Sequence, residues 1–329
     1  MNSKTKNKKA QAEMFNWIFA IFVGAIILFL ALFGTFQYIK IQRHRIDTEI
    51  AMQIGILLNP LETSMEIATA TEILMPSETK ILLKCDEDYE ELGKQDLSIK
   101  TASALGKKWE DYGAAHTITN KYIYADNSTS NKLYVFSKSF SFPFKIADLI
   151  YVTAKDYCFV DPPDNIKDEL LQLNISNINV NTSLEYCKSK AVSVCFGENG
   201  ECEISVYGSC DENFCPNSFE YGEVIKDNEV VYYATDALLY AAIFSETDNY
   251  KCNLKRLLSR IEKLSQLYNE RAIRLYAKGC GTADVQEKLV ALEREAEIEK
   301  GISNPNLALL YSTMNELEDA NSYVRCEVY

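Results

Sequence analysis

Histidine is almost absent from this chain, whose 329 residues contain only His44 and His116. Neither can be matched to a motif-bearing Ser or Cys nucleophile, so no hydrolase-type triad is indicated. The chain also lacks a Cys-x-x-Cys pair, the spacing from which structural zinc sites usually take two ligands. No Gly-rich phosphate-binding loop occurs. The sequence therefore predicts no enzyme activity, no catalytic residue, no metal site and no cofactor.

Positive charge is scarce beyond the N-terminus. Residues 47–329 hold 27 Lys and Arg against 46 Asp and Glu, a formal net charge of −19. A surface this acidic repels phosphate backbones, which excludes nucleic acid as a partner. The acidic run Asp86-Glu87-Asp88-Tyr89-Glu90-Glu91 lacks the spaced ligands and the Gly of a calcium loop, so we interpret it as solvated charge.

The chain contains ten cysteines, and all of them follow its long hydrophobic run. An even number is typical of a closed disulfide framework, and disulfides persist only in oxidising compartments. The candidate disulfide residues are Cys85, Cys158, Cys187, Cys195, Cys202, Cys210, Cys215, Cys252, Cys280 and Cys326. The sequence therefore predicts that the part of the chain after the hydrophobic run lies outside the cytoplasm.

The hydrophobic run covers 22 residues, Phe15 to Phe36, of which only Asn16 and Thr35 are polar. As a helix it would be roughly 33 Å long, enough to cross a bilayer. A cleavable secretory signal has a shorter apolar region and a small-residue cleavage site after it, and neither feature is present. We expect a single-pass protein of the cell membrane, with the lipid bilayer as its first partner.

The orientation of this span follows from the cysteines rather than from the flanking charges. Four lysines precede the run and three basic residues follow it, a margin too small for the positive-inside rule. The cysteines predict a cytoplasmic N-terminus and an extracellular C-terminal domain. Three sequons agree with this orientation and are candidate glycosylation sites: Asn127, Asn174 and Asn181.

Five segments are predicted along the chain. Residues 1–14 form a basic cytoplasmic tail, and residues 15–36 the transmembrane helix. Residues 37–59 continue it as a stalk packed against the outer domain, because Ile and Leu recur at helix-compatible spacing up to Asn59-Pro60. Residues 60–235 form an α+β ectodomain, and residues 236–329 are helical. The fold class is α+β, with a disulfide-stapled ectodomain and a C-terminal helical hairpin or three-helix unit.

The tail segment Lys8-Lys9-Ala10-Gln11-Ala12-Glu13 precedes the hydrophobic run directly. It resembles the class III signal of archaeal type IV pilin-like proteins. The resemblance implies processing between Ala10 and Gln11 by a membrane prepilin peptidase, with the hydrophobic helix kept as anchor or filament core. The family commonly places Glu five residues into the mature chain, whereas this chain has Phe15 there. A plain Lys-rich tail on a signal-anchor is the alternative. The outer domain, through Asp236 to Leu257, is similar to uncharacterised membrane-anchored archaeal proteins.

The outer domain begins with segments rich in Val, Ile, Tyr and Phe that are separated by turn residues, a pattern that predicts strands. The expected strands are Thr79–Lys84, Lys121–Ala125, Lys132–Ser137, Ala147–Thr153, Val192–Phe196, Glu203–Val206 and Val224–Tyr233. Ile166–Leu173 is expected to be a short helix after the Asp161-Pro162-Pro163-Asp164 turn.

One hairpin is predicted around Glu198-Asn199-Gly200. A three-residue loop would pair Val194 with Ile204 and Val192 with Val206, which places the branched apolar residues on one face. This register sends Cys195 and Cys202 to opposite faces of the hairpin. Disulfide geometry needs β-carbons about 4 Å apart, so we predict no bond between these two cysteines.

The C-terminal region reads as helical. A short apolar helix is expected from Thr235 to about Ser245, and a second from about Asn249 to Lys278, ended by Gly279. Asp284 with Glu287, and Asn304-Pro305, predict the starts of two further helices. In an up-down-up arrangement of the last three helices, Cys280 and Cys326 lie at the same pole. We therefore predict a Cys280–Cys326 disulfide.

These features favour a membrane-anchored structural, adhesion or pilin-like surface protein. The alternative is a membrane-anchored accessory subunit or binding module of a surface complex. Both predict protein partners, through self-association or through that complex. An anchored enzyme with an active site outside known motifs would need a convergent acidic pocket.

Overall fold

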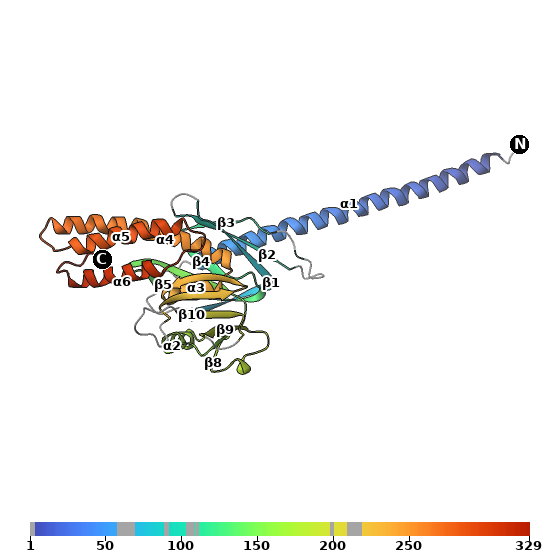
Figure 1. Cartoon of the computed structure of the whole chain (residues 1–329). Helices are drawn as coiled ribbons and strands as arrows, with labels where there is room; N and C mark the ends of the chain where they lie inside the picture. Colours follow the sequence, from blue (N-terminus) through green and yellow to red (C-terminus); the bar gives the residue numbers. More distant parts are fainter. Residues whose placement is uncertain are drawn as a thin grey trace.

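The structure, a computed structural model, describes residues 4–57, 70–88, 92–102, 109, 112–197, 201–208 and 219–329. Its element order confirms the predicted α+β class, with an N-terminal helix, a region rich in strands and a helical C-terminal part. The long helix projects from one end of the molecule, and the C-terminal helices lie at the opposite end (Figure 1).

Helix α1 (Lys4–Leu57) is continuous over 54 residues. Its segment Asn16–Ile39 has a mean hydropathy of 2.7 and no buried residues, and it is long and apolar enough to cross a membrane. The second half of α1 contacts strands β2 and β3, where Thr48 Oγ1 accepts a hydrogen bond of 3.0 Å from the Ala114 N–H. The predicted packing of this half against the outer domain is therefore confirmed. Asn59-Pro60 lies outside the described residues.

The first sheet has six strands in the order β3-β2-β1-β5-β6-β4. Its strands are β1 (Ala70–Asp86), β2 (Lys94–Thr101), β3 (His116–Thr119), β4 (Tyr122–Ala125), β5 (Thr129–Ser141) and β6 (Lys145–Thr153). The sheet is curved, so that Gln95 in β2 reaches β4 near the opposite edge. The Gln95 amide donates to the Ile123 carbonyl and accepts from the Ile123 N–H, both at 2.8 Å. The Gln95 side chain thus joins β2 to the edge strand β4 with the pair of hydrogen bonds that a neighbouring strand would make.

The second sheet also has six strands, in the order β12-β11-β10-β9-β7-β8. They are β7 (Tyr157–Val160), β8 (Ile178–Asn181), β9 (Val192–Phe196), β10 (Ile204–Gly208), β11 (Tyr221–Lys226) and β12 (Glu229–Ala234). Helix α2 (Asp164–Leu173) follows β7 as predicted, and a short 3-10 helix spans Leu184–Tyr186.

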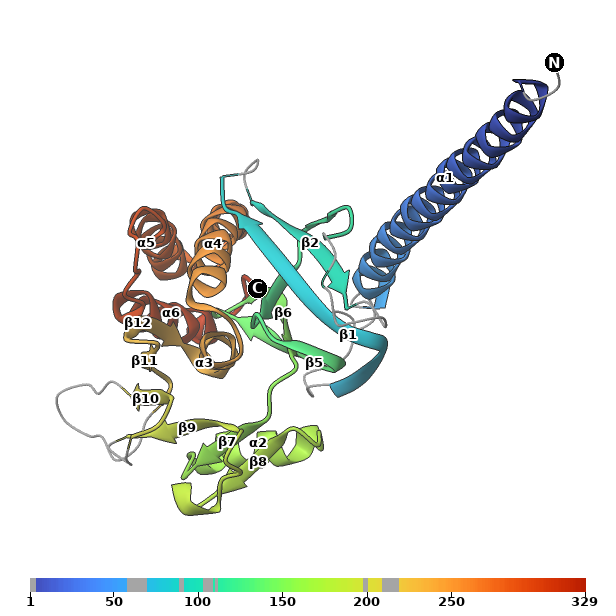
Figure 2. The ribbon, with the colours of Figure 1, turned by 90° about the vertical axis from the view of Figure 1, so that its right-hand side faces the viewer.

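Helix α3 (Thr235–Phe244) lies between the two sheets and is buried from Ala237 to Phe244. It contacts β4, β5 and β6 of the first sheet and β11 and β12 of the second. Phe244 shows how it joins them, because its ring lies 5.1 Å from that of Phe136 and 4.7 Å from that of Tyr157. Figure 2 shows α3 beside both sheets. The apolar run that predicts this helix is thus the centre of the core.

Three helices complete the chain: α4 (Thr247–Tyr276), α5 (Ala283–Lys300) and α6 (Ala308–Tyr323). Contacts of α5 with both neighbours give the up-down-up arrangement. The disulfide between Cys280 and Cys326 is present, as predicted. Two predicted helix starts are displaced. Asp284 lies in the first turn of α5 rather than at its N-cap, and α6 begins three residues after Pro305.

The predicted hairpin is wrong in strand direction. Strand β10 runs parallel to β9, with Val194 opposite Ile204 and Val206 opposite Phe196. Both apolar pairs lie in the core, as they would in an antiparallel hairpin, so the period-two pattern fits either direction. The loop residues Glu198-Asn199-Gly200 lie outside the described residues.

The prediction that Cys195 and Cys202 are not bonded is also wrong, because the structure links them. Cys202 lies in the connection before β10 rather than in the strand itself. The alternation of side-chain faces along a strand therefore does not fix the direction of the Cys202 side chain, which can turn back toward Cys195.

The strand predicted over Val224–Tyr233 is instead the hairpin of β11 and β12. Asp227 and Asn228 both have positive φ, 51° and 62°, the conformation of a two-residue type I′ turn. The Asp-Asn pair was the signal for this turn. Strands β2, β3, β7 and β8 were not predicted.

Candidate functional site

Four disulfides link the described cysteines. They join Cys85 to Cys252, Cys158 to Cys187, Cys195 to Cys202, and Cys280 to Cys326. Cys210 and Cys215 lie outside the described residues. The first of these bonds fastens β1 to α4 across 167 residues of sequence.

A cavity of about 380 Å³ lies beside that bond, between β1, the end of β4, the β11–β12 turn and the start of α4. We call it the seam cavity, because it continues the line along which Gln95 closes the first sheet. Its lining residues are Ile81, Leu82, Leu83, Cys85, Ala125, Asp126, Asn127, Asp227, Glu229, Glu246, Thr247, Asp248, Asn249 and Cys252. Five of them are carboxylic acids and none is Lys or Arg, so the lining is strongly anionic.

The deepest carboxylate of the seam cavity, Asp126, already has partners. One of its oxygens accepts hydrogen bonds from Thr153 Oγ1 at 2.6 Å and from the Tyr157 hydroxyl at 3.2 Å. The other accepts from the backbone N–H and the hydroxyl of Ser128. Four donors satisfy this buried charge, so Asp126 is a structural part of the wall.

The other acids of the cavity are closer to solvent. Glu246 is half-buried and accepts from the Asn127 N–H at 3.0 Å. Asp248 is exposed in the first turn of α4, where a carboxylate stabilises the helix dipole. Asp227 and Glu229 are exposed at the β11–β12 turn, and Glu229 pairs with Lys251 at 2.7 Å.

One lysine adjoins this cluster, the buried Lys226. Its ammonium donates to the carbonyls of Ile243 at 3.2 Å and Ser245 at 2.7 Å, at the C-terminal end of α3. Burial lowers the pKa of Lys226, and the carboxylate of Glu246 partly opposes this effect. Because it is held by α3, Lys226 does not point a free cation into the seam cavity.

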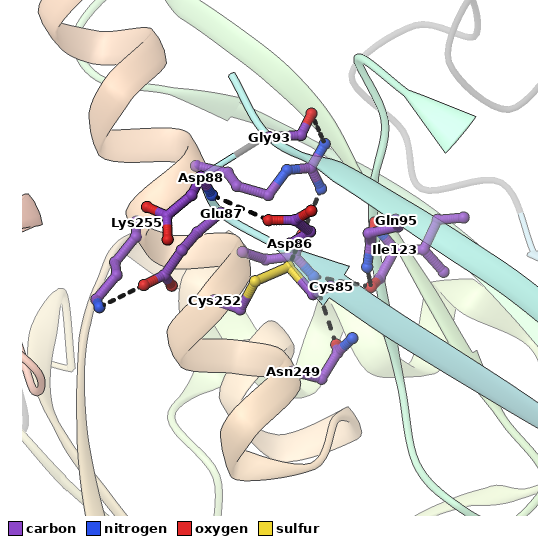
Figure 3. The surroundings of a disulfide bond; sticks show 12 residues. Cys85, Asp86, Glu87, Asp88, Gly93, Gln95, Ile123, Asn249, Cys252 and Lys255 are labelled. Carbon is purple, nitrogen blue, oxygen red and sulfur yellow. Dashed lines mark hydrogen bonds and ion pairs between the residues drawn. A yellow bond between two sulfur atoms is a disulfide. The ribbon is translucent and has the colours of Figure 1, made fainter. Parts of the chain in front are cut away.

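The wall that α4 contributes is held by polar contacts (Figure 3). Asn253 donates to the Ile123 carbonyl at 3.0 Å and accepts from Arg256 at 2.7 Å, which fixes the orientation of its amide. The Asn253 NH2 group also donates to the side-chain oxygen of Asn249 at 3.5 Å, so the Asn249 NH2 group points the other way. Asn249 is 8% exposed, lines the seam cavity, and its NH2 group has no hydrogen-bond partner among the described residues.

The predicted glycosylation residues lie in different settings. Asn127 is exposed at the rim of the seam cavity. Asn174 is exposed and caps α2 in the left-handed conformation, with φ 48°. Asn181 is half-buried, and its NH2 group contacts Cys158 Sγ at 3.1 Å. Asn181 is therefore the least accessible to a glycan of the three.

The remaining predicted residues are not brought together. Ala10 and Gln11 lie in the first turns of α1, and their side chains are outside the described residues. His116 begins β3, and Glu87 of the acidic run pairs with Lys255 at 2.7 Å. Within the part of the chain that the structure describes, no group of three or more His, Cys, Asp or Glu has the geometry of a metal site.

The chain matches no protein-family model, no curated protein and no solved structure. The geometry of the site therefore carries the functional argument. The seam cavity was not predicted from the sequence, because its acids come from three separate segments of the chain. The Asp-Asn turn and the acids at the start of α4 were the available signals.

Proposed function

We propose that this chain is a membrane-anchored surface protein whose disulfide-bonded domain has a structural or adhesive role outside the cell. The observation that carries the proposal is the division of α1 into two halves. The segment Asn16–Ile39 presents exposed apolar surface all round, including Trp17 at 74% and Phe22 at 66% exposure. The second half contacts the outer domain. An isolated helix with such an apolar surface is unstable in water, whereas lipid or neighbouring helices would cover the surface.

The pilin-like form of this proposal is supported by the same helix. A continuous helix with an exposed apolar segment followed by a part packed on a sheet can serve as an anchor or as a filament core. The four disulfides support an oxidising location for the outer domain.

Fractionation tests anchorage, and proteolysis tests orientation. After alkaline carbonate extraction the protein should stay in the membrane pellet. A membrane-impermeant protease added to intact cells should digest the outer domain. Full protection in intact cells, with digestion only in inverted vesicles, would overturn the proposed orientation. Shearing of cells distinguishes the two forms of the protein. A filament subunit should appear in the sheared fraction, whereas an anchored accessory protein should stay with the cells.

The second candidate is a membrane-anchored binding module of a surface complex. The seam cavity favours it, because five carboxylic acids and no basic residue line a cavity of about 380 Å³, a size suited to holding a ligand.

A further inference from the structure

We infer that one edge of the outer domain rests on the surface of the membrane that α1 spans, with lipid headgroups as its partner. This edge, the lysine–tryptophan rim, consists of Lys80, Lys100, Trp109 and Tyr112. Its contact with lipid rests on the proposed membrane anchorage and goes beyond it, because an anchor alone leaves the height and tilt of the domain undetermined.

Helix α1 brings the rim close to the bilayer. The apolar segment of α1 ends at Ile39, and Thr48 accepts the hydrogen bond from the Ala114 N–H. The helix covers only about 14 Å between Ile39 and Thr48. Strand β2 ends beside α1, on the side of the domain from which the helix leaves (Figures 1 and 2). Headgroups extend about 5–8 Å beyond the hydrocarbon core, so long side chains at this edge reach them when the helix tilts as spanning helices usually do.

The aromatic residues of the rim surround one ammonium group. Lys100 Nζ lies 5.7 Å from the centre of the Trp109 ring and 4.5 Å from that of the Tyr112 ring. Trp109 is nevertheless 37% exposed. Indole and phenol rings are enriched where lipid meets water, because the ring faces the acyl chains while its polar atom stays hydrated. A lipid surface would therefore cover the exposed part of Trp109.

The lysines of the rim carry a charge opposite to that of lipid phosphates. Lys80 and Lys100 are direct partners across β1 and β2, so their side chains lie on the same face of the sheet. Within the described residues neither ammonium forms an ion pair with a carboxylate. Arg45, exposed on α1 between the apolar segment and Thr48, adds a third cation. A phosphate group near the two lysines would relieve their mutual repulsion.

The remaining charge of the outer domain favours contact through this edge. Residues 47–329 have a formal net charge of −19, so a surface of phosphates repels most of the domain. Residues 103–111, which adjoin the rim in sequence, contain two lysines and two acids, and these charges cancel. The attraction at this edge therefore comes from the rim lysines and Arg45.

Trp109 can report on the contact directly. Trp17 is the only other tryptophan in the chain, so Trp17→Phe leaves Trp109 as the single indole fluorophore. The full chain with this change is reconstituted in vesicles of phosphatidylcholine and phosphatidylglycerol, some of whose headgroups carry a nitroxide quencher. We expect the labelled headgroups to quench Trp109 fluorescence and aqueous acrylamide to quench it weakly.

The matched control moves the fluorophore to the opposite end of the molecule. It combines Trp17→Phe, Trp109→Phe and Tyr323→Trp, because Tyr323 is 87% exposed on α6. Acrylamide should quench this tryptophan strongly, and the labelled headgroups should not. Equal quenching of the two single-tryptophan proteins by the headgroups would overturn the inference.

Two double variants in the Trp17→Phe protein test the charges. A lysine near an anionic surface contributes about fivefold to binding, so Lys80→Gln with Lys100→Gln should lower the ratio of docked to free domain up to about 25-fold. Headgroup quenching of Trp109 should then be lost, and Arg at both positions should preserve it. Lys188→Gln with Lys190→Gln removes two exposed lysines before β9 and should change nothing. Equal losses in the two glutamine pairs would show non-specific attraction and contradict the inference.

Carbonate extraction of the same proteins keeps the two proposals apart. A chain that stays in the membrane pellet while its Trp109 escapes headgroup quenching would refute the rim contact alone. A chain that leaves the membrane on extraction would refute the anchorage, and the rim contact with it.

Discussion

Arg256 is a buried charge whose hydrogen bonds hold α4 to the first sheet. Its guanidinium donates to the carbonyls of Leu92 at 3.0 Å and Lys121 at 3.0 Å, and lies 4.7 Å from the Tyr122 ring. Burial lowers the pKa of Arg256, but these acceptors keep the charge tolerable in the core. The contacts require the turn before β2 to approach α4 closely.

Gly93 makes this approach possible, and its substitution is the first prediction. Its φ is 65°, and a β-carbon there would lie 2.6 Å from the Asp86 carbonyl oxygen and 2.8 Å from Arg256 Cγ. Gly93→Ala should lower the free energy of unfolding by about 2–4 kcal/mol. Thermal unfolding measures the change. Gly281→Ala is the control, because a β-carbon there meets nothing within 4 Å. Equal stability of the two variants would contradict the close approach.

The carboxyl group of Asp236 should make the stability of the protein depend on pH. Burial raises the pKa of Asp236 above its ordinary 3.8, and Lys138, 3.7 Å away, partly opposes this. As the pH rises from 3.8 through the folded-state pKa, the folded protein still holds a proton that the unfolded chain has lost. Stability from this group therefore falls across that window. Asp236→Asn cannot titrate, so its stability relative to wild type should increase as the pH rises.

Urea unfolding of both proteins between about pH 3 and about pH 7 measures this difference. Asp319→Asn serves as the control for loss of one exposed carboxylate. A difference between Asp236→Asn and wild type that stays constant across the range would refute the assignment.

Among the elements, the three C-terminal helices depend most on one covalent link. The Cys280–Cys326 bond spans 46 residues, the part of the chain that holds α5 and α6. Replacing both cysteines by Ser should reduce stability by about 3–4 kcal/mol on the loop-entropy model. Hydrogen exchange should accelerate in α6 and little in the buried strands of the two sheets. Exchange that accelerates equally in the sheets would show that the helices do not form a separate unit.

Helix α1 provides the next prediction at this scale. Ile27→Lys with Leu30→Lys places two charges at the middle of the apolar segment, each costing about 2.5–3.5 kcal/mol at a bilayer centre. This variant should be lost from the carbonate-resistant membrane fraction. Ile41→Lys, beyond the segment Asn16–Ile39, should remain there. Retention of the double variant in the pellet would rule out the segment as the anchor.

At the scale of the whole molecule, the N-terminus decides between a fixed anchor and a subunit that can leave the bilayer. Processing after Ala10 would remove all four tail lysines. We predict that peptide mapping of protein from its own membranes gives Gln11 as the first residue. The Ala10→Asp variant should keep its tail. An intact Met1 tail in the wild type would contradict processing, and a signal-anchored domain would be the remaining interpretation.

Patterns local in sequence determined a large part of this protein. A run of apolar residues is sufficient to mark a helix that must be covered by lipid or protein, and cysteines restricted to one side of it indicate the compartment. The spacing of apolar residues in the last third identified the helices, and their alternating direction placed Cys280 near Cys326. The helix predictions need only the spacing of neighbouring residues, and the disulfide prediction adds only the alternating direction of consecutive helices.

Only the tertiary structure decided how the strands meet. Apolar alternation places Val194 and Ile204 in the core whether β9 and β10 run parallel or antiparallel, so it could not exclude the Cys195–Cys202 bond. The seam cavity likewise depends on Gln95 reaching Ile123 and on Asn253, 130 residues further along the chain, reaching the same carbonyl. Such contacts join residues with no relation in sequence. They form because the two sheets pack around α3 and the chain must satisfy the backbone groups left at their edges.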